Sequence, residues 1–83
     1  MNHNKLKRER HPMPTDILKA LENNGVRESY YQRPAYQQND YIGWITSAKQ
    51  QKTRSKRLSQ MIAELKQGGI YMGMDHPPSR KDS

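Results

Sequence analysis

The sequence predicts an all-α fold, a small bundle of three to four short helices, and two observations support this. First, two consecutive stretches carry apolar side chains at the i, i+3, i+4 spacing of a helix. These are Tyr41, Trp44, Ile45 and Ala48, followed by Leu58, Met61, Ile62 and Leu65. Second, glycine, proline or asparagine punctuates the chain between the periodic stretches, as expected for helices joined by tight turns.

Both ends of the chain are expected to be disordered tails. Residues 1–13 are basic and almost free of apolar side chains, and residues 73–83 are polar, with Pro77 and Pro78 expected to prevent regular structure. The helical domain then spans residues 14–72. A domain of this size buries only about 60% of the surface that its unfolded chain exposes, so its stability is expected to be marginal.

The first helix is expected to open at Pro14 and Asp16, with Thr15 as its N-cap. Asn24 and Gly25 should end it, since glycine readily adopts the left-handed conformation that follows a helix C-cap. One or two helical turns are expected between Val26 and Arg33, ending before Pro34. Tyr30 and Tyr31 point in different directions there, so one of them should be buried.

The third helix is expected from about Ala35 to Ser47 and the last from about Gln51 or Lys52 to Gln67, where Gly68 and Gly69 stop it. Trp44 carries the largest apolar surface in the chain. It is therefore expected to be largely buried against Leu58, Met61 and Ile62. Gly43 lies in the middle of the third helix, either because another backbone approaches closely or as a tolerated surface glycine.

Composition argues against several classes of chemistry. The chain has no cysteine, which removes disulfides, thiol catalysis and cysteine zinc sites. Its three histidines, His3, His11 and His76, fall in the predicted tails, where no scaffold would fix a base or a metal ligand. The sequence therefore predicts a non-enzymatic protein with no catalytic residue, metal or cofactor. Since it also has no long apolar run and no secretory signal, it is expected to be cytoplasmic.

The formal net charge of +7 allows a nucleic acid or another anionic surface as a partner, although much of this charge lies in the basic N-terminal tail, where solvated charge is the first interpretation. The candidate anion- or partner-binding residues lie between the two apolar stripes, at Lys49, Lys52, Thr53, Lys56 and Arg57. Thr53 and nearby backbone amides could hold a phosphate with the cations around it, or the cations could be an ordinary solvated helix face. Arg54 lies at the edge of the apolar stripe. We therefore expect it to be structural, like Trp44, and to pair with Asp40 or Glu28.

A family resemblance rests on short motifs in order. They are Tyr41-Ile42-Gly43-Trp44-Ile45, Ala48-Lys49, Thr53-Arg54 and Lys56-Arg57-Leu58, preceded by Pro14, Asp16, Ile17, Ala20 and Leu21 in the opening helix. This pattern resembles the YdeI/OmpD-associated, or bacteriocin-protection, family. Members often carry a Ser-Arg-Arg-Glu-like segment where this chain has Gln37 to Asp40. Larger members also have an upstream domain.

The resemblance implies a small accessory or protein-interaction module linked to stress or bacteriocin tolerance, with a protein partner or a second copy of the chain. The alternative is a basic nucleic-acid-binding protein that uses the segment from Lys49 to Arg57. A helix-turn-helix fits this segment only loosely, because its cations cluster at the helix junction. Weak contact with the nucleic-acid backbone is the expectation for that alternative.

Overall fold

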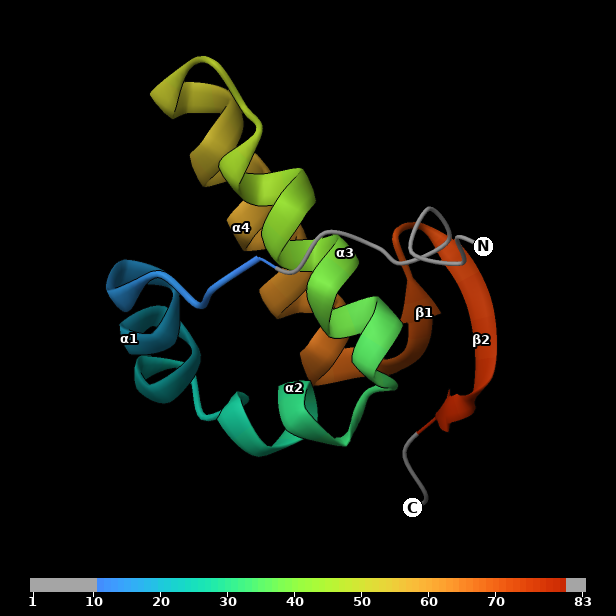
Figure 1. The fold of residues 1–83 in the computed structure, drawn as a ribbon. Helices are drawn as coiled ribbons and strands as arrows, with labels where there is room; N and C mark the ends of the chain where they lie inside the picture. The colour runs from blue at the N-terminus through green and yellow to red at the C-terminus, as the bar shows by residue number, and fades with distance from the viewer. Residues whose placement is uncertain (1–10, 81–83) are drawn as a thin grey trace, which may run out of the picture.

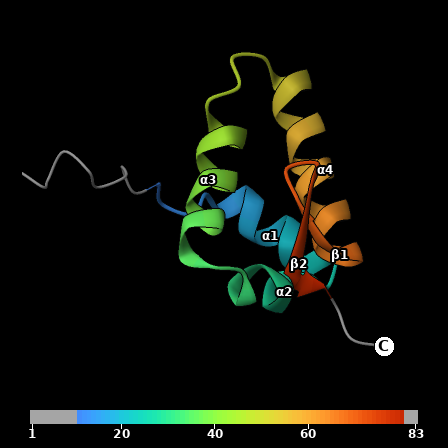
Figure 2. The same cartoon turned by 90° about the vertical axis from the view of Figure 1, so that its right-hand side faces the viewer.

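The computed structural model describes residues 11–80, and the side chains of residues 11–74. Four helices come first: α1 (Thr15–Asn23), α2 (Arg27–Gln32), α3 (Ala35–Thr46) and α4 (Gln51–Gln67). An antiparallel hairpin follows, formed by β1 (Gly68–Tyr71) and β2 (Met74–Arg80). The helices α3 and α4 lie side by side, and the end where they join projects beyond the rest of the domain (Figures 1 and 2). The predicted mostly helical fold is confirmed.

The first helix ends as predicted but begins differently. Gly25 has φ +69°, its N–H donates to the Glu22 carbonyl at 3.1 Å, and the Val26 N–H donates to the Leu21 carbonyl at 3.0 Å. This pair of bonds is a Schellman motif. At the other end the N-cap is Pro14, whose backbone is extended, and no side chain caps the helix. Thr15 is already helical, so the prediction of Thr15 as the N-cap is wrong.

The short helix α2 confirms the predicted helical turns before Pro34. Tyr30 is buried, and its hydroxyl donates to the Gln38 carbonyl at 3.1 Å. Tyr31 is 47% exposed and packs edge-on against the Tyr30 ring. One tyrosine of the pair is therefore buried, as expected.

The core is formed by one face of each helix. Its buried apolar members are Ile17, Leu21, Val26, Tyr30, Tyr41, Ile42, Ile45, Met61 and Leu65. Trp44 is only partly buried and packs at the margin, as do Leu58 and Ile62. Trp44 thus packs against the core as expected, but at its margin and not among its buried members. At about 100° per residue, Tyr41, Ile42 and Ile45 share one face of α3, and Trp44 lies about 110° from the centre of that face.

The hairpin is the main difference from the sequence prediction, which placed a tail from residue 73 and excluded regular structure at Pro77 and Pro78. Ile70 pairs with Asp75 and Tyr71 with Met74, but the next pair is Gly68 with Arg80. The two prolines thus lie in an irregular stretch of β2 between these pairs. In a two-stranded sheet both strands are edges, where a residue without an N–H is tolerated.

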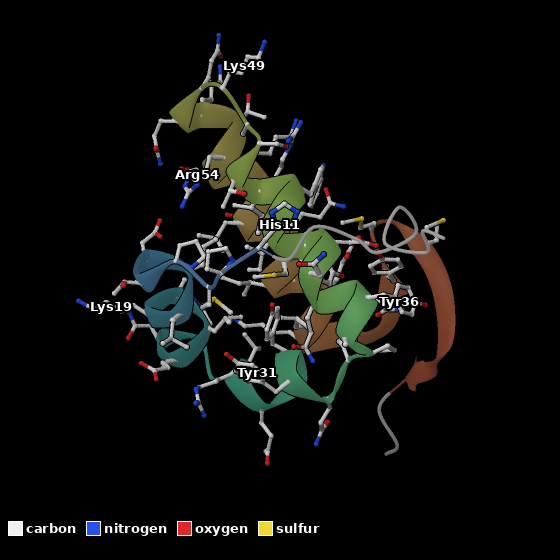
Figure 3. The ribbon with its side chains drawn as sticks, viewed as in Figure 1. His11, Lys19, Tyr31, Tyr36, Lys49 and Arg54 are labelled. Carbon is white, nitrogen blue, oxygen red and sulfur yellow. The ribbon has the colours of Figure 1, made fainter. Side chains whose placement is uncertain are left out.

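The residues just before α1 also pack on the domain, although the sequence placed them in a tail. The His11 N–H donates to the Asn39 side-chain oxygen at 2.8 Å, and Met13 contacts the core. The His11 ring lies over α3 (Figure 3). A Cβ at Gly43 would come within 2.7 Å of its Nε2 atom, so the group nearest to Gly43 is a side chain and not another backbone. The other two histidines lie outside the described side chains.

Candidate anion-binding surface

The described residues contain two polar constellations, one buried and one exposed. The buried one centres on Glu64, which the sequence analysis did not single out. Its Oε1 accepts from the Tyr41 hydroxyl at 2.5 Å and from the Met72 N–H at 2.8 Å. Its Oε2 accepts from the Gly73 N–H at 2.8 Å and from the Gln60 amide at 3.0 Å. Each carboxylate oxygen therefore has two donors.

Glu64 holds the hairpin turn onto the helices. The two central residues of that turn have positive φ, 49° at Met72 and 82° at Gly73, as in a type I′ turn. Their N–H groups both point at the carboxylate, which replaces water as their acceptor. The hairpin is thereby fixed over Tyr41, where the Tyr71 ring packs edge-on at 5.5 Å between centroids.

The groups around Glu64 extend this buried network. Arg33 is 5% exposed and donates to the Gln37 side chain at 3.2 Å and to the Glu64 carbonyl at 3.3 Å. Burial, and secondly the bond to Glu64, raises the pKa of Tyr41 far above its ordinary value, so Tyr41 remains a neutral donor. The Tyr71 hydroxyl donates to Asp40 at 2.6 Å. These contacts tie α2, α3, α4 and the hairpin together.

The exposed constellation is the basic segment that joins α3 to α4. Lys49, Lys52 and Lys56 are exposed as predicted, and Lys49 lies at the projecting tip (Figure 3). Thr53 is partly buried. The N-cap of α4 is Gln50, and no side chain caps this helix. Whether Thr53 takes part in phosphate binding stays a prediction.

Arg54 pairs with Asp16 of α1, which corrects the expected partners Asp40 and Glu28. One guanidinium nitrogen lies 3.0 Å from the Asp16 carboxylate, on the side of α4 that faces α1. The hydrogen bond from Arg54 lowers the pKa of Asp16 below its ordinary value. The pair contributes stability above the unfolded-state pKa and loses it as pH falls through the folded-state value. The contribution is small, because the Asp16 side chain is 61% exposed.

Arg57 was grouped with the solvated lysines, and the structure corrects this too. Its guanidinium lies over the Trp44 ring, 5.4 Å from the centroid, and donates to the Trp44 carbonyl at 2.6 Å. A cation at the last turn of α3 satisfies a terminal carbonyl and complements the negative end of the helix dipole. Arg57 therefore joins α3 to α4, the kind of role predicted for Arg54.

We expect Arg57→Ala to lower the free energy of unfolding by about 1–2 kcal/mol, because it removes a hydrogen bond to a charged donor and a cation–π contact. Arg54→Ala removes only an exposed ion pair and should cost less than about 1 kcal/mol. Lys56→Ala is the control and should change stability by less than about 0.5 kcal/mol. Urea unfolding of the three variants measures the order of these stability losses. A larger loss for Arg54→Ala than for Arg57→Ala would contradict the prediction.

The exposed side of α4 forms one continuous surface, here called the outer face. At about 100° per residue its members fall within a sector of about 120°. They are Lys52, Ser55, Lys56, Ser59, Ala63, Lys66 and Gln67, and all are exposed. The face has three cations and no carboxylate. Between Tyr41 and Ala63 the sequence has five lysines and arginines and no acidic residue.

Lys66, in the last turn of α4, complements the negative end of the helix dipole, but the other two charges on this face do not stabilise the helix by themselves. Lys52 lies in the first turn, near the positive end of the helix dipole, and that turn contains no acidic residue. Lys52 and Lys56 form a like-charge i, i+4 pair, which is destabilising by about 0.2–0.5 kcal/mol. An ordinary solvated helix of this length would gain from interspersed glutamates. The outer face is therefore complementary to a negatively charged surface.

The described residues show neither a metal cluster nor a membrane helix. No group of three or more histidine, cysteine or acidic side chains comes together there in a way that could hold a metal ion. None of the helices in this part of the chain is both long and apolar enough to cross a membrane.

The fold and this surface define a small, mostly helical domain. It has a cationic outer face on α4 and a buried carboxylate, Glu64, whose two oxygens each accept two hydrogen bonds. The chain belongs to the family described as Bacteriocin-protection, YdeI or OmpD-Associated, whose model matches residues 11–68. The match covers all four helices and begins at His11, which agrees with the packing of His11 on α3. No curated protein and no solved structure matches the chain.

Proposed function

We propose that this protein is a non-enzymatic accessory module that binds an anionic macromolecule through the outer face of α4. The supporting observation is the charge pattern of that face, which has three exposed lysines and no carboxylate. Charge complementarity of this kind accelerates association and selects partners by sign. In this proposal the module acts in the cytoplasm beside its partner and carries out no reaction itself.

The proposal that the protein catalyses no reaction is supported by the hydrogen bonds that the buried carboxylate of Glu64 accepts. Glu64 is the acid that most resembles a catalytic group, because it is buried and adjoins Tyr41. A general base needs a lone pair directed at a substrate proton. Both oxygens of Glu64 instead receive two donors each from the protein. This arrangement suits a structural anchor.

Retention on immobilised heparin tests whether the outer face is the binding surface. The double variant Lys52→Gln/Lys56→Gln should elute at a clearly lower salt concentration than the wild type. The matched control is Lys19→Gln/Arg27→Gln, which removes the same charge from exposed positions on α1 and α2. The control should elute close to the wild type. Equal shifts in the two variants would mean that only net charge matters and would overturn the proposal.

A further inference from the structure

We infer that the outer face of α4 binds the phosphate backbone of double-stranded nucleic acid, with little preference for sequence. This inference rests on the proposed function and names the partner of the same surface. Three features of α4 support it. They are the length of the lysine row, the short side chains between the lysines, and the contacts that hold Gln51, Gln60 and Arg57 within the protein.

The length of the row fits several phosphates. Lys52 and Lys66 are 14 residues apart on one helix. At 1.5 Å per residue they are separated by about 21 Å along the axis. One strand of duplex DNA carries a phosphate about every 3.4 Å along its axis, so this length corresponds to about six base pairs. Lys49, at the tip where α3 joins α4, lies just beyond the Lys52 end of the row.

The side chains between the lysines allow a close approach. Ser55, Ser59 and Ala63 are exposed and shorter than lysine, so the ammonium groups are the outermost atoms of the face. Lysine and serine are typical donors to phosphate oxygens. An interface with another protein usually depends on aromatic side chains, methionine or arginine and is depleted in lysine, serine and alanine. A membrane surface would require large apolar side chains on the face.

Two of the three glutamines of α4, Gln51 and Gln60, are engaged within the protein, which argues against base recognition. The Gln60 amide donates to Glu64 at 3.0 Å, and the Gln51 amide donates to the Ser55 hydroxyl at 3.2 Å. Arg57, the side chain best suited to reading guanine, is held over Trp44. The cations left on the face are lysines, which act as point charges. Contacts to phosphates should therefore dominate.

The test uses the full chain and two labelled 20-base-pair DNA duplexes of unrelated sequence, titrated at several salt concentrations. The wild type should bind both duplexes within about twofold of each other. The variant Lys52→Gln/Lys56→Gln/Lys66→Gln should make the negative slope of log affinity against log salt shallower by about 2.7, since each phosphate contact contributes about −0.9 to that slope. Its thermal transition should match that of the wild type, because all three side chains are exposed.

Polyglutamate, added as a competitor at equal charge, separates a phosphate backbone from an acidic protein surface. It should compete much less well than unlabelled duplex. Competition as effective as that of the duplex would overturn the inference in favour of an acidic protein partner. An unchanged salt slope in the triple variant would also overturn it, because the duplex would then bind elsewhere. Absence of duplex binding, with heparin retention still dependent on the outer face, would overturn the inference and leave the proposed function standing.

Discussion

Glu64→Gln should lower the free energy of unfolding by about 3 kcal/mol and release the hairpin from the helices. The carboxylate accepts two backbone N–H groups of the turn, at Met72 and Gly73, and the Tyr41 hydroxyl. Glutamine has one oxygen and an NH₂ group that would face these donors. Each buried donor left without an acceptor costs about 1–3 kcal/mol. The loss is thus large for a single-atom replacement.

Two measurements test this prediction. Urea unfolding, followed by the fluorescence of the single tryptophan, gives the change in stability. Amide hydrogen exchange at Met72 and Gly73 should become much faster in Glu64→Gln, because opening of the turn no longer breaks a charge-assisted bond. Glu28→Gln makes the same chemical change at an exposed position and should have an effect below about 0.5 kcal/mol. Unchanged exchange at the turn would show that Glu64 does not anchor the hairpin.

Helical periodicity predicted the helices well, since their order and most of their ends depend on local signals. The stop at Gly25, the break at Pro34 and the extent of α4 all follow from residues next to one another in the chain. The N-cap at Pro14 did not, because a threonine beside it offered a stronger side-chain signal. Such alternatives differ by about 1 kcal/mol, which neighbouring structure readily overrides.

The two arginines show why contacts between helices were harder to predict. Arg54 and Arg57 lie about 60° apart on α4, both on the same side of the centre of its apolar stripe. Which of the two faces the end of α3 and which faces α1 depends on how the helices cross, and the sequence pattern does not contain that angle. Arg57 consequently has the role expected of Arg54, and Arg54 pairs with Asp16.

The buried carboxylate was missed for a related reason. Glu64 lies beside Met61 and Leu65, a position from which burial could be suspected. Two of its four donors, however, come from the turn of a hairpin that Pro77 and Pro78 were expected to exclude. If no turn is expected at Met72 and Gly73, no backbone N–H groups are expected near Glu64. A carboxylate beside the apolar stripe of α4 is then assigned to the surface. The exposure of Lys52 and Lys56, by contrast, could be predicted from the helical wheel alone.

Tyr41→Ala should be the most destabilising of the aromatic substitutions, at about 3–5 kcal/mol. Tyr41 is the largest fully buried side chain, and its ring packs against Tyr71. Its removal leaves a cavity between α3, α4 and the hairpin and takes one donor from Glu64. This loss approaches the whole stability of many small domains. The variant should therefore lack a cooperative thermal transition when followed by circular dichroism.

Trp44→Ala and Tyr41→Phe separate the causes of that loss. Trp44 is larger but only partly buried, so Trp44→Ala should cost about 2 kcal/mol and keep a cooperative transition. Tyr41→Phe keeps the packing and removes only the bond to Glu64, at a cost of about 1–2 kcal/mol. A cooperative transition in Tyr41→Ala together with its loss in Trp44→Ala would mean that the core centres on the tryptophan. The predicted order would instead confirm that α3 contributes its Tyr41 face to the core and leaves Trp44 at the edge, where Arg57 covers it.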